Sequence, residues 1–470
     1  MEAININKIV QNGFCIGCGA CAIATDQKIQ IRLNQYGCYE PVLTTEPYDE
    51  QKALHACPFS NNGPNEDQLG ETLFNTNQDV EKDLRLGHYR SLYMGHVEEG
   101  SYREKATSGG VISWLLATLL EKDLVDFAIH VKPADRSKEG KLFKYDTSDS
   151  PESVLVGAKS RYYPVEISEA LERVKSIPGR YVFVGLPCFV KAIRRLMISD
   201  PVIQERILFC VGLVCGHLKS TAFAENFAWQ AGIAPKELEE VDFRVKLKGR
   251  TAGDYGVYVR GSEKTDVRAT RSYFGYNWGH NFFRYAACNY CDDVFAETAD
   301  VVVGDAWLPQ YEKDSRGTSL VIVRNELLGA LFDEARAEKR VSFDEVSADQ
   351  MATSQAGGLR DRREGLAYRL YLKKEKNEWI PHKRVEPNGV LSRQRKKIYQ
   401  LRIETEKKSH EAWVEAVKRG SYEWFRKELF PYVKKCNRLY CPLYKRLVII
   451  SCKVLRNPRV LVDKIKKMRG

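Results

Sequence analysis

The sequence lacks any long hydrophobic run. Residues 1–5 have neither the positively charged start nor the apolar core of a secretory signal, and no later stretch is long and apolar enough to span a bilayer. The sequence also has no internal repeat, and its composition is not that of a disordered chain. These absences argue against secreted, membrane-spanning and repeat proteins, so we expect a globular protein in the cytoplasm.

Length and composition set the outer limits of the fold. With 470 residues, of which 43% are hydrophobic and 29% are charged, the chain can form two or three domains with sizeable cores. Its 13 cysteines are an odd number. Because the cytosol keeps thiols reduced, metal ligands and buried free thiols explain these cysteines better than disulfides do.

The net charge of +11 comes mainly from the end of the chain. Lysine and arginine concentrate in the segments 360–363, 393–397 and 464–467. Such a basic region attracts an acidic carrier protein, an anionic membrane surface or nucleic acid, but solvated helix faces have the same composition. We therefore predict no specific nucleic-acid partner, and peripheral membrane contact through the basic C-terminus remains a hypothesis.

Three cysteines stand close together near the N-terminus, at Cys15, Cys18 and Cys21. Thiolates at this spacing, with two glycines between them, can wrap a tight turn around a cube of iron and sulfide, and Cys57, which precedes a proline, supplies the fourth ligand. Zinc is the alternative, but zinc sites usually pair two Cys-x-x-Cys units. Cys38 could replace Cys57, although no proline follows it. We predict one 4Fe-4S cluster here.

The hydrophobic pattern divides the chain into three parts. Residues 1–65 hold the cysteine run and an alternating segment, 29–33, and are predicted to form a small ferredoxin-like iron–sulfur module. Residues 84–345 alternate β-rich runs with helical patterns, which predicts an α/β fold (mixed α+β) with a mostly parallel sheet and antiparallel additions. The polar stretch 61–83 is predicted to be a linker or a peripheral connection. Residues 346–470 are predicted to be a basic helical region interrupted by its prolines.

Three predicted strands end next to residues that could act chemically. Segment 180–185 leads to Cys188, segment 207–214 leads to Cys215, and segment 300–304 leads to Asp305. Ligands of open α/β sheets bind at the carboxyl ends of parallel strands. We therefore expect these three strand ends to converge.

A second set of four cysteines emerges from these strand ends. Cys288 and Cys291 form a Cys-x-x-Cys pair, and Cys188 and Cys215 complete the set. The pair alone fits zinc, a redox disulfide or an iron–sulfur cluster, so its spacing does not decide between them. His217 lies beside Cys215 and is a candidate catalytic proton donor, although a lone histidine is more often structural.

A Thr-Ser-Gly-Gly sequence at residues 107–110 precedes the apolar helical run 111–120. It offers a hydroxyl cap and backbone amides at a helix N-terminus, which suit the pyrophosphate of a flavin or nicotinamide. The same sequence is common in proteins that bind nothing. Segment 159–163 places cations beside phenols, as an anionic cofactor requires, and surface polarity explains it equally well.

The order of these motifs resembles the coenzyme F420 hydrogenase/dehydrogenase beta subunit family, which includes 7-hydroxymethyl chlorophyll a reductase. The resemblance extends from about residue 12 to 340 and rests on the two cysteine sets together with the Thr-Ser-Gly-Gly and Ser-Arg-Tyr segments. It implies a flavin enzyme that holds FAD beside iron–sulfur clusters. The residues it assigns to FAD are Thr107, Ser108, Gly109, Gly110, Ser160, Arg161 and Tyr162, and those it assigns to a second 4Fe-4S cluster are Cys188, Cys215, Cys288 and Cys291.

The resemblance also implies a function. We expect an iron–sulfur flavoprotein oxidoreductase that passes electrons between a carrier, either ferredoxin or an F420-like molecule, and a substrate through two 4Fe-4S clusters and FAD. The alternative is a non-catalytic electron-transfer subunit of a larger redox complex. A zinc-stabilised nucleic-acid binder would use the positive charge, but it leaves the three-cysteine run unexplained. Many relatives have a second such run, which this chain lacks, so one N-terminal cluster is the most it can hold.

Overall fold

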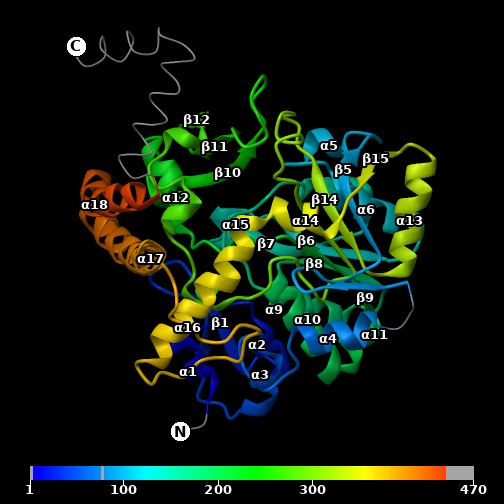
Figure 1. The fold of residues 1–470 in the computed structure, drawn as a ribbon, viewed down its shortest axis with the longest axis horizontal. Coiled ribbons are helices and arrows are strands. Elements are labelled where there is room, and N and C mark those ends of the chain that lie inside the picture. The colour runs from blue at the N-terminus through cyan, green and yellow to red at the C-terminus, as the bar shows by residue number, and fades with distance from the viewer. Residues whose placement is uncertain (1–3, 76–78, 441–470) are drawn as a thin grey trace. The chain divides into compact units, whose positions relative to one another are not determined.

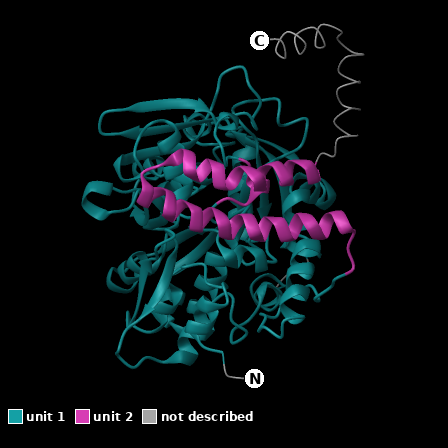
Figure 2. Cartoon of the chain, turned by 90° about the vertical axis from the view of Figure 1, so that its left-hand side faces the viewer, with its two compact units in different colours: residues 1–276, 283–389 teal, residues 277–282, 390–470 magenta. Residues whose placement is uncertain are grey.

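The computed structural model describes residues 4–75 and 79–440 of the chain. These residues form two compact units, drawn in teal and magenta in Figure 2. The second unit contains Asn277–Phe282 and the residues from Val390 onward, and the first contains the rest. The basic segment 464–467, part of the region predicted to contact a membrane, lies outside the described residues. The domain boundaries predicted from the sequence remain predictions.

A sheet of eight strands forms the centre of the first unit (Figure 1). In the order in which they pair, the strands are β15 (Val341–Glu345), β5 (Ser91–Val97), β14 (Ser319–Val323), β13 (Val301–Asp305), β9 (Ile207–Leu213), β8 (Tyr181–Gly185), β6 (Phe127–Pro133) and β7 (Phe143–Ser148). Strands β13, β9, β8 and β6 are mutually parallel, and the strands outside them pair antiparallel. This sheet confirms the predicted mixed α/β fold with a parallel centre and antiparallel additions.

The central strands are apolar because helices cover them. Every residue of β8 and of β14 is buried, as expected for strands with no face toward water. α6 (Val111–Glu121) and α13 (Glu326–Ala337) contribute Trp114 and Phe332 to the core cluster that covers one side of the sheet. α10 (Pro187–Ser199) packs against β8 and β9. The carboxyl ends of β8 and β9 are therefore held in place by the packing of α10 against both strands.

The N-terminal part of the chain forms three short helices and a hairpin. These are α1 (Ile6–Gln11), α2 (Ala20–Ala24), β1 (Ile29–Leu33), β2 (Tyr39–Leu43) and α3 (Glu50–Ala56). β1 has the bounds predicted from its alternating pattern, and it pairs antiparallel with β2. α2 contacts α3, α9 (Ser168–Ser176) and α10. The cysteine-bearing turn is thus packed against the central domain.

The prediction of a linker over residues 61–83 is wrong. The segment contains α4 (Glu66–Phe74), which begins at a capping box formed by Asn65 and Gln68. Leu69 and Phe74 of this helix are buried, and Glu66 forms an ion pair with a lysine of α10. The apolar residues are few in a polar sequence, so composition alone concealed a helix with a buried face.

Three further strands form a smaller antiparallel sheet. They are β10 (Leu238–Val245), β11 (Gly256–Gly261) and β12 (Thr265–Ala269), and β11 pairs with both of the others. α12 (Ala222–Gln230) packs against it. The remaining elements of the first unit are β3 (Glu81–Asp83), β4 (Gly87–Tyr89), α5 (Tyr102–Lys105), α7 (Arg136–Glu139), α8 (Pro151–Val156), α11 (Pro201–Arg206), α14 (Ala348–Ser354), α15 (Ala356–Arg360) and α16 (Leu366–Lys374).

The second unit is a helical hairpin, as the pattern of its sequence predicts. α17 (Arg393–Arg419) and α18 (Tyr422–Tyr440) pack through the rings of Trp413 and Phe425, whose centroids are 5.2 Å apart in an edge-to-face arrangement. Pro431 lies inside α18, so it does not interrupt the helix as expected. Across the described ranges, no helix combines the length and the apolar character that crossing a bilayer requires.

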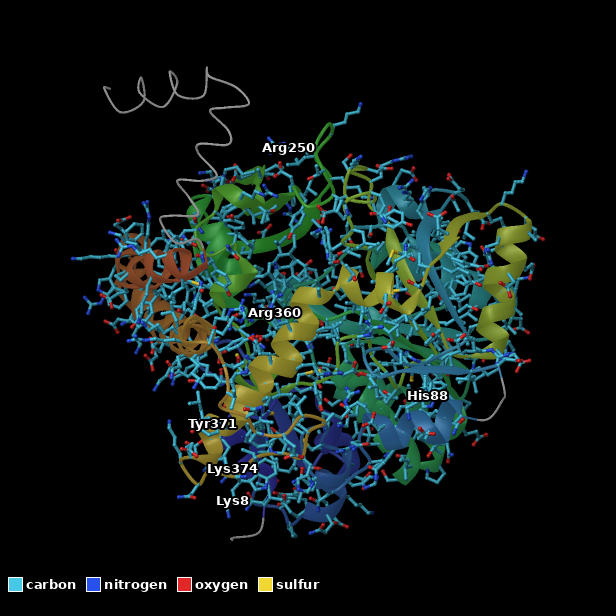
Figure 3. The ribbon with its side chains drawn as sticks, in the orientation of Figure 1. Lys8, His88, Arg250, Arg360, Tyr371 and Lys374 are labelled. Carbon is cyan, nitrogen blue, oxygen red and sulfur yellow. The ribbon has the colours of Figure 1, made fainter. Side chains whose placement is uncertain are left out.

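Arg324 provides a test of the core. It is 2% exposed, and its guanidinium donates to the carbonyls of Leu86, His88 and Ala299 at 2.8, 2.6 and 2.9 Å. Lysine cannot reproduce this fork, so we expect Arg324→Lys to lower the free energy of unfolding by about 3 kcal/mol in urea denaturation. Arg250→Lys at the surface (Figure 3) should change it by less than about 0.5 kcal/mol. Equal effects of the two substitutions would contradict the prediction.

Candidate functional site

The four N-terminal cysteines line one pocket. Cys15, Cys18 and Cys21 lie in the turn before and at the start of α2, and Cys57 follows α3. The pocket has an empty volume of about 370 Å³, which includes its opening to solvent, and its other walls are mostly apolar. The structure therefore brings together the four residues that the sequence predicts. Cys38 does not line this pocket.

The thiols of this first set lie close enough to influence one another. Burial raises the pKa of all four thiols. The neighbouring thiols also raise the pKa of Cys15, Cys18 and Cys21, and the pKa of Cys18 reaches about 12 through these causes together. Arg195 and Lys191 act in the opposite direction on the pKa of Cys57. A set of buried thiols is stable as thiolates only when cations accompany them, which is the donor chemistry of a metal centre.

Gly17 and Gly19 make the turn around this pocket possible. Their φ angles are +63° and +90°, in the left-handed region that favours glycine. A Cβ at Gly17 would lie 2.2 Å from the carbonyl oxygen of Tyr39, and one at Gly19 would lie 2.7 Å from Oε2 of Glu166. The amide of Gly17 donates to Sγ of Cys15 over 3.3 Å. Backbone and thiol are therefore closely packed, as a buried cluster requires.

The second set of cysteines also converges. β8 and β9 pair so that Gly185 faces Gly212, and Cys188 and Cys215 follow these two residues closely at the same edge of the sheet. Cys288 lies in a 3₁₀ turn, Ala286–Tyr290. Burial raises the pKa of Cys188, and the thiols of the other three members raise it further. The parallel strand ends thus bring together cysteines that are far apart in the sequence.

In the described part of the chain, no group of three or more His, Cys, Asp or Glu side chains is gathered closely enough to bind a single metal ion. Zinc and an iron–sulfur cluster use the same thiolate donors, so the chemistry of the donors fits either.

The two sets are neighbours. Cys18 of the first set contributes to the raised pKa of Cys188 in the second, and both raise the pKa of Tyr145. The rings of Phe14 and Tyr290, which adjoin members of different sets, are 4.8 Å apart in an edge-to-face contact. The adjacency of the two sets was not predicted, because no spacing in the sequence relates one set to the other.

The segments predicted to bind FAD meet at the start of α6. Oγ1 of Thr107 and Oγ of Ser160 are 3.0 Å apart, and Oγ of Ser108 donates to the carbonyl of Thr318 at 2.9 Å. The expected hydroxyl cap is wrong, because Gly110 is the N-cap residue and no side chain caps the helix. The hydroxyl groups instead join this turn to neighbouring segments.

Sequence reasoning missed two basic residues near this place, one in β10 and one directly after it. Nη1 of Arg244 lies 3.2 Å from Oδ2 of Asp305 and 3.3 Å from the hydroxyl of Tyr162. Nζ of Lys246 donates to the carbonyls of Arg103 and Ser108. Burial and the nearby cations Lys159 and Arg103 together lower the pKa of Lys246 to about 8. β10 has a register irregularity between Asp242 and Val245 and ends before Lys246, so strand alternation in the sequence does not reveal this pair.

Several buried nitrogen atoms around this place have no partner. Among the described residues, Nη1 of Arg103 and Nε of Arg244 are buried and make no hydrogen bond. Nε of Arg161 is also unpaired, but its guanidinium lies over the ring of Phe143, 4.7 Å from the centroid. Buried donors without acceptors are costly. The guanidinium of Arg244 likewise lies over the ring of Tyr255, 4.2 Å from the centroid. An anionic group beside Arg103 would supply the acceptor that its Nη1 lacks.

His217 lies in a cationic environment. Burial holds the pKa of its imidazole well below the usual value, and Lys219, Arg284 and Arg362 lower it further. The ring is therefore neutral near pH 7, and its surroundings do not favour proton donation. Its catalytic role remains a prediction from the sequence.

Comparison with known families assigns the chain. Family models for the N-terminal and the C-terminal part of the "Coenzyme F420 hydrogenase/dehydrogenase, beta subunit" match residues 92–172 and 179–349, more than half of the chain. The chain belongs to the coenzyme F420 hydrogenase/dehydrogenase beta subunit family. This confirms the family resemblance inferred from the motifs. The first cysteine set and the helices after residue 349 lie outside the matched residues.

Individual relatives are distant. The chain is 24% identical over 364 residues to a coenzyme F420-dependent sulfite reductase of Methanocaldococcus jannaschii, and the match covers 73% of this chain and 49% of the reductase. It therefore spans about half the length of that relative. It is 23% identical to coenzyme F420 hydrogenase subunit beta of Methanothermobacter thermautotrophicus, over 53% of this chain and 82% of the hydrogenase polypeptide. A chain of the F420-reducing NiFe hydrogenase complex of Methanosarcina barkeri superposes with a TM-score of 0.49 at 17% identity, over 64% of this chain and 98% of that one.

Gly17 provides a test of the first cysteine turn. We expect Gly17→Ala to lower the free energy of unfolding by at least about 1 kcal/mol, because alanine is strained at this φ and its Cβ would meet the Tyr39 carbonyl. Gly357→Ala is the control, since nothing lies within 4 Å of a Cβ built there and the residue is in α15. That change should be neutral or stabilising. Urea denaturation of both variants measures the difference, and an unaffected Gly17→Ala protein would refute the tight turn.

Proposed function

We propose that the chain is an iron–sulfur flavoprotein oxidoreductase that transfers electrons between a carrier, either ferredoxin or an F420-like molecule, and a substrate. The observation that carries the proposal is the pair of adjacent four-cysteine sets, together with a turn at which the buried Nη1 of Arg103 makes no hydrogen bond. Membership of the coenzyme F420 hydrogenase/dehydrogenase beta subunit family supports it. The names of the relatives, a sulfite reductase and a hydrogenase subunit, both denote redox proteins.

Each cysteine set would hold one 4Fe-4S cluster. Bound clusters carry single electrons and bound FAD exchanges two, which suits a protein that links one-electron and two-electron partners. The protein's own contribution is to hold the thiols together, largely buried and close to cations. For the first set, Arg195 supplies that cation, since its guanidinium donates to the carbonyl of Cys57. The ligands would be Cys15, Cys18, Cys21 and Cys57 in the first set and Cys188, Cys215, Cys288 and Cys291 in the second.

The turn before α6 would bind the pyrophosphate of FAD. α6 has no side-chain cap, so its first amides are available to an anion, and Arg103 and Lys246 add positive charge beside them. Nη2 of Arg103 is fixed by the carbonyl of Gly317 at 2.9 Å and by Asp314 at 3.0 Å, which leaves Nη1 for a ligand. The residues assigned to FAD by the sequence are retained in the proposal, with Arg103, Arg244 and Lys246 added.

The second candidate function is that of a non-catalytic subunit. The name of one relative, coenzyme F420 hydrogenase subunit beta, denotes a part of a larger enzyme. A chain that only relays electrons would load the same clusters, so cofactor content does not separate the two functions. Turnover by the isolated chain with a reduced carrier and an artificial acceptor does separate them. Sustained flavin-dependent turnover supports the enzyme, and its absence with fully loaded cofactors supports the non-catalytic role.

Cofactor content tests the site directly. We expect anaerobically purified protein to contain about eight irons, matching sulfide and one FAD per chain. Cys57→Ser and Cys291→Ser should each remove about four irons, because each removes one ligand of a different cluster. Iron, sulfide, zinc and flavin assays with an absorption spectrum before and after dithionite measure this.

Two cysteines serve as controls for this experiment. Cys210 is buried but belongs to neither set, and Cys38 is the alternative to Cys57 that does not line the pocket. Their serine variants should keep all the iron. Loss of iron from Cys38→Ser but not from Cys57→Ser would assign the fourth ligand to Cys38, and zinc without flavin would overturn the proposed function.

The pH dependence of FAD binding tests the basic turn. The pKa of Lys246 is lowered to about 8, so its ammonium is charged below that pH and neutral above it. FAD affinity should therefore fall as the pH rises from 7 to 9, and Lys246→Met should weaken it about tenfold at pH 7 and flatten the profile. Fluorescence titration of deflavinated protein measures both. Lys374→Met is the control, because Lys374 is exposed on α16 (Figure 3); an unchanged profile in Lys246→Met would contradict the assignment.

A further inference from the structure

The helical run that follows the family-matched residues buries arginines. It consists of α15, a single wider π-helical turn at Asp361–Gly365, and α16. Arg362 and Arg369 are 2% and 1% exposed, although arginine is rarely buried without a specific partner. Neither residue belongs to the cysteine sets or to the FAD turn. Their burial therefore needs an explanation that the proposed function does not give.

These arginines bind the backbone that carries the second cysteine set. Nη2 of Arg362 donates to the carbonyls of Cys215 and Gly216 at 2.7 and 2.8 Å. Nε of Arg369 donates to the carbonyl of Asn289 at 2.6 Å, within the Cys-x-x-Cys turn. The two loops that carry three of the four thiols are thus held by one helical run.

Arg362 also faces the thiols themselves. Its guanidinium interacts with the side chain of Cys291 and with the charge of Cys215. The π-helical turn lies between the straight helices α15 and α16 and includes Arg362. Such turns are rare and occur frequently at functional sites.

The charges around this set do not cancel. Arg284, Arg362 and Arg369 are three buried cations, and Asp361 is the carboxylate between them, at 3.2 Å from Arg284 and 3.0 Å from Arg369. Lys219 adds another cation near His217. Among the residues that follow Cys291, the carboxylate of Asp292 is paired with Lys383 and Arg384, and Glu297 is paired with Arg384. Asp293 is a further buried carboxylate that faces Cys215. With Asp293 counted as an anion, these six cations still outnumber the four carboxylates, so the surplus is positive.

We propose that Arg362 is a positioning residue that holds the Cys215 loop and raises the reduction potential of the cluster bound by the second cysteine set. The proposal rests on the proposed function, because it requires a cluster there. Reduction adds one electron to the cluster, breaks no bond and leaves the guanidinium protonated. A fixed buried cation stabilises the more negative, reduced form more than the oxidised form. Arg362 would thus favour electron entry into this set.

Three variants test the proposal. Arg362→Gln removes the charge, Arg362→Lys keeps it without the forked hydrogen bonds, and Arg360→Gln removes an exposed arginine two residues away on the same run (Figure 3). Redox titration followed by electron paramagnetic resonance gives the potentials. The signal that survives in Cys57→Ser belongs to the second cluster. We expect Arg362→Gln to weaken the one-electron reduction equilibrium of that cluster about tenfold, a shift of about 59 mV to lower potential.

The controls separate the outcomes. Arg360→Gln should leave both potentials unchanged, and Arg362→Lys should retain about eight irons with less than half of the shift. An unchanged potential in Arg362→Gln with full iron overturns the proposal and leaves the proposed function intact. Equal loss of iron from Arg362→Gln and Arg362→Lys also overturns it, because the residue would then act on folding alone. Unsubstituted protein without a second cluster would instead refute the proposed function.

Discussion

Cys21 lies in α2 and Cys188 in α10, but the other members of both sets lie on turns and loops, and buried guanidinium groups hold parts of that backbone in place. Loop carbonyls removed from water need donors, because each unpaired group costs about 1–3 kcal/mol. A guanidinium has five N–H donors in one plane, so a single arginine can pair with several carbonyls. Arg195 does this for the turn that carries Cys57, and Arg362 does it for the loop that carries Cys215. The placement of the thiols therefore depends on residues that are not ligands.

α10 connects the two sets. Cys188 lies in its first turn, Arg195 lies two turns later, and the buried pair between Lys191 and Glu66 ties the same helix to α4. A buried ion pair contributes little net stability, because desolvation of two charges offsets their attraction. The pair instead fixes the position of α4 on α10, because any other arrangement of the two helices would leave the charge of Lys191 or Glu66 buried without a partner. α10 thus contributes to both sets and helps to fix the distance between them. Electron transfer between clusters bound there would require such a fixed distance.

Sequence reasoning found the features that are local or that follow from the sheet. Cys15, Cys18 and Cys21 are recognisable by spacing, and Cys188 and Cys215 are recognisable because parallel strands end at one edge. It did not find Arg362, whose partner carbonyl at Cys215 is 147 positions earlier in the chain. It also missed α4, because a polar composition hides the few apolar residues of a short helix that has one buried side. It missed the basic pair Arg244 and Lys246, because the sequence at the end of a strand does not show which segment that end will contact.

The matched family residues carry the second set and the predicted FAD turn, while both ends of the first unit add to them. The N-terminal addition places Phe14 against Tyr290, and the later helices place Arg369 on Asn289. The Cys-x-x-Cys turn is therefore packed from two directions by the chain itself. The first set also lines a pocket that opens to solvent. Each set consists of one buried and three partly buried cysteines, so the exposure of the thiols does not single out either set as the point of contact for a carrier.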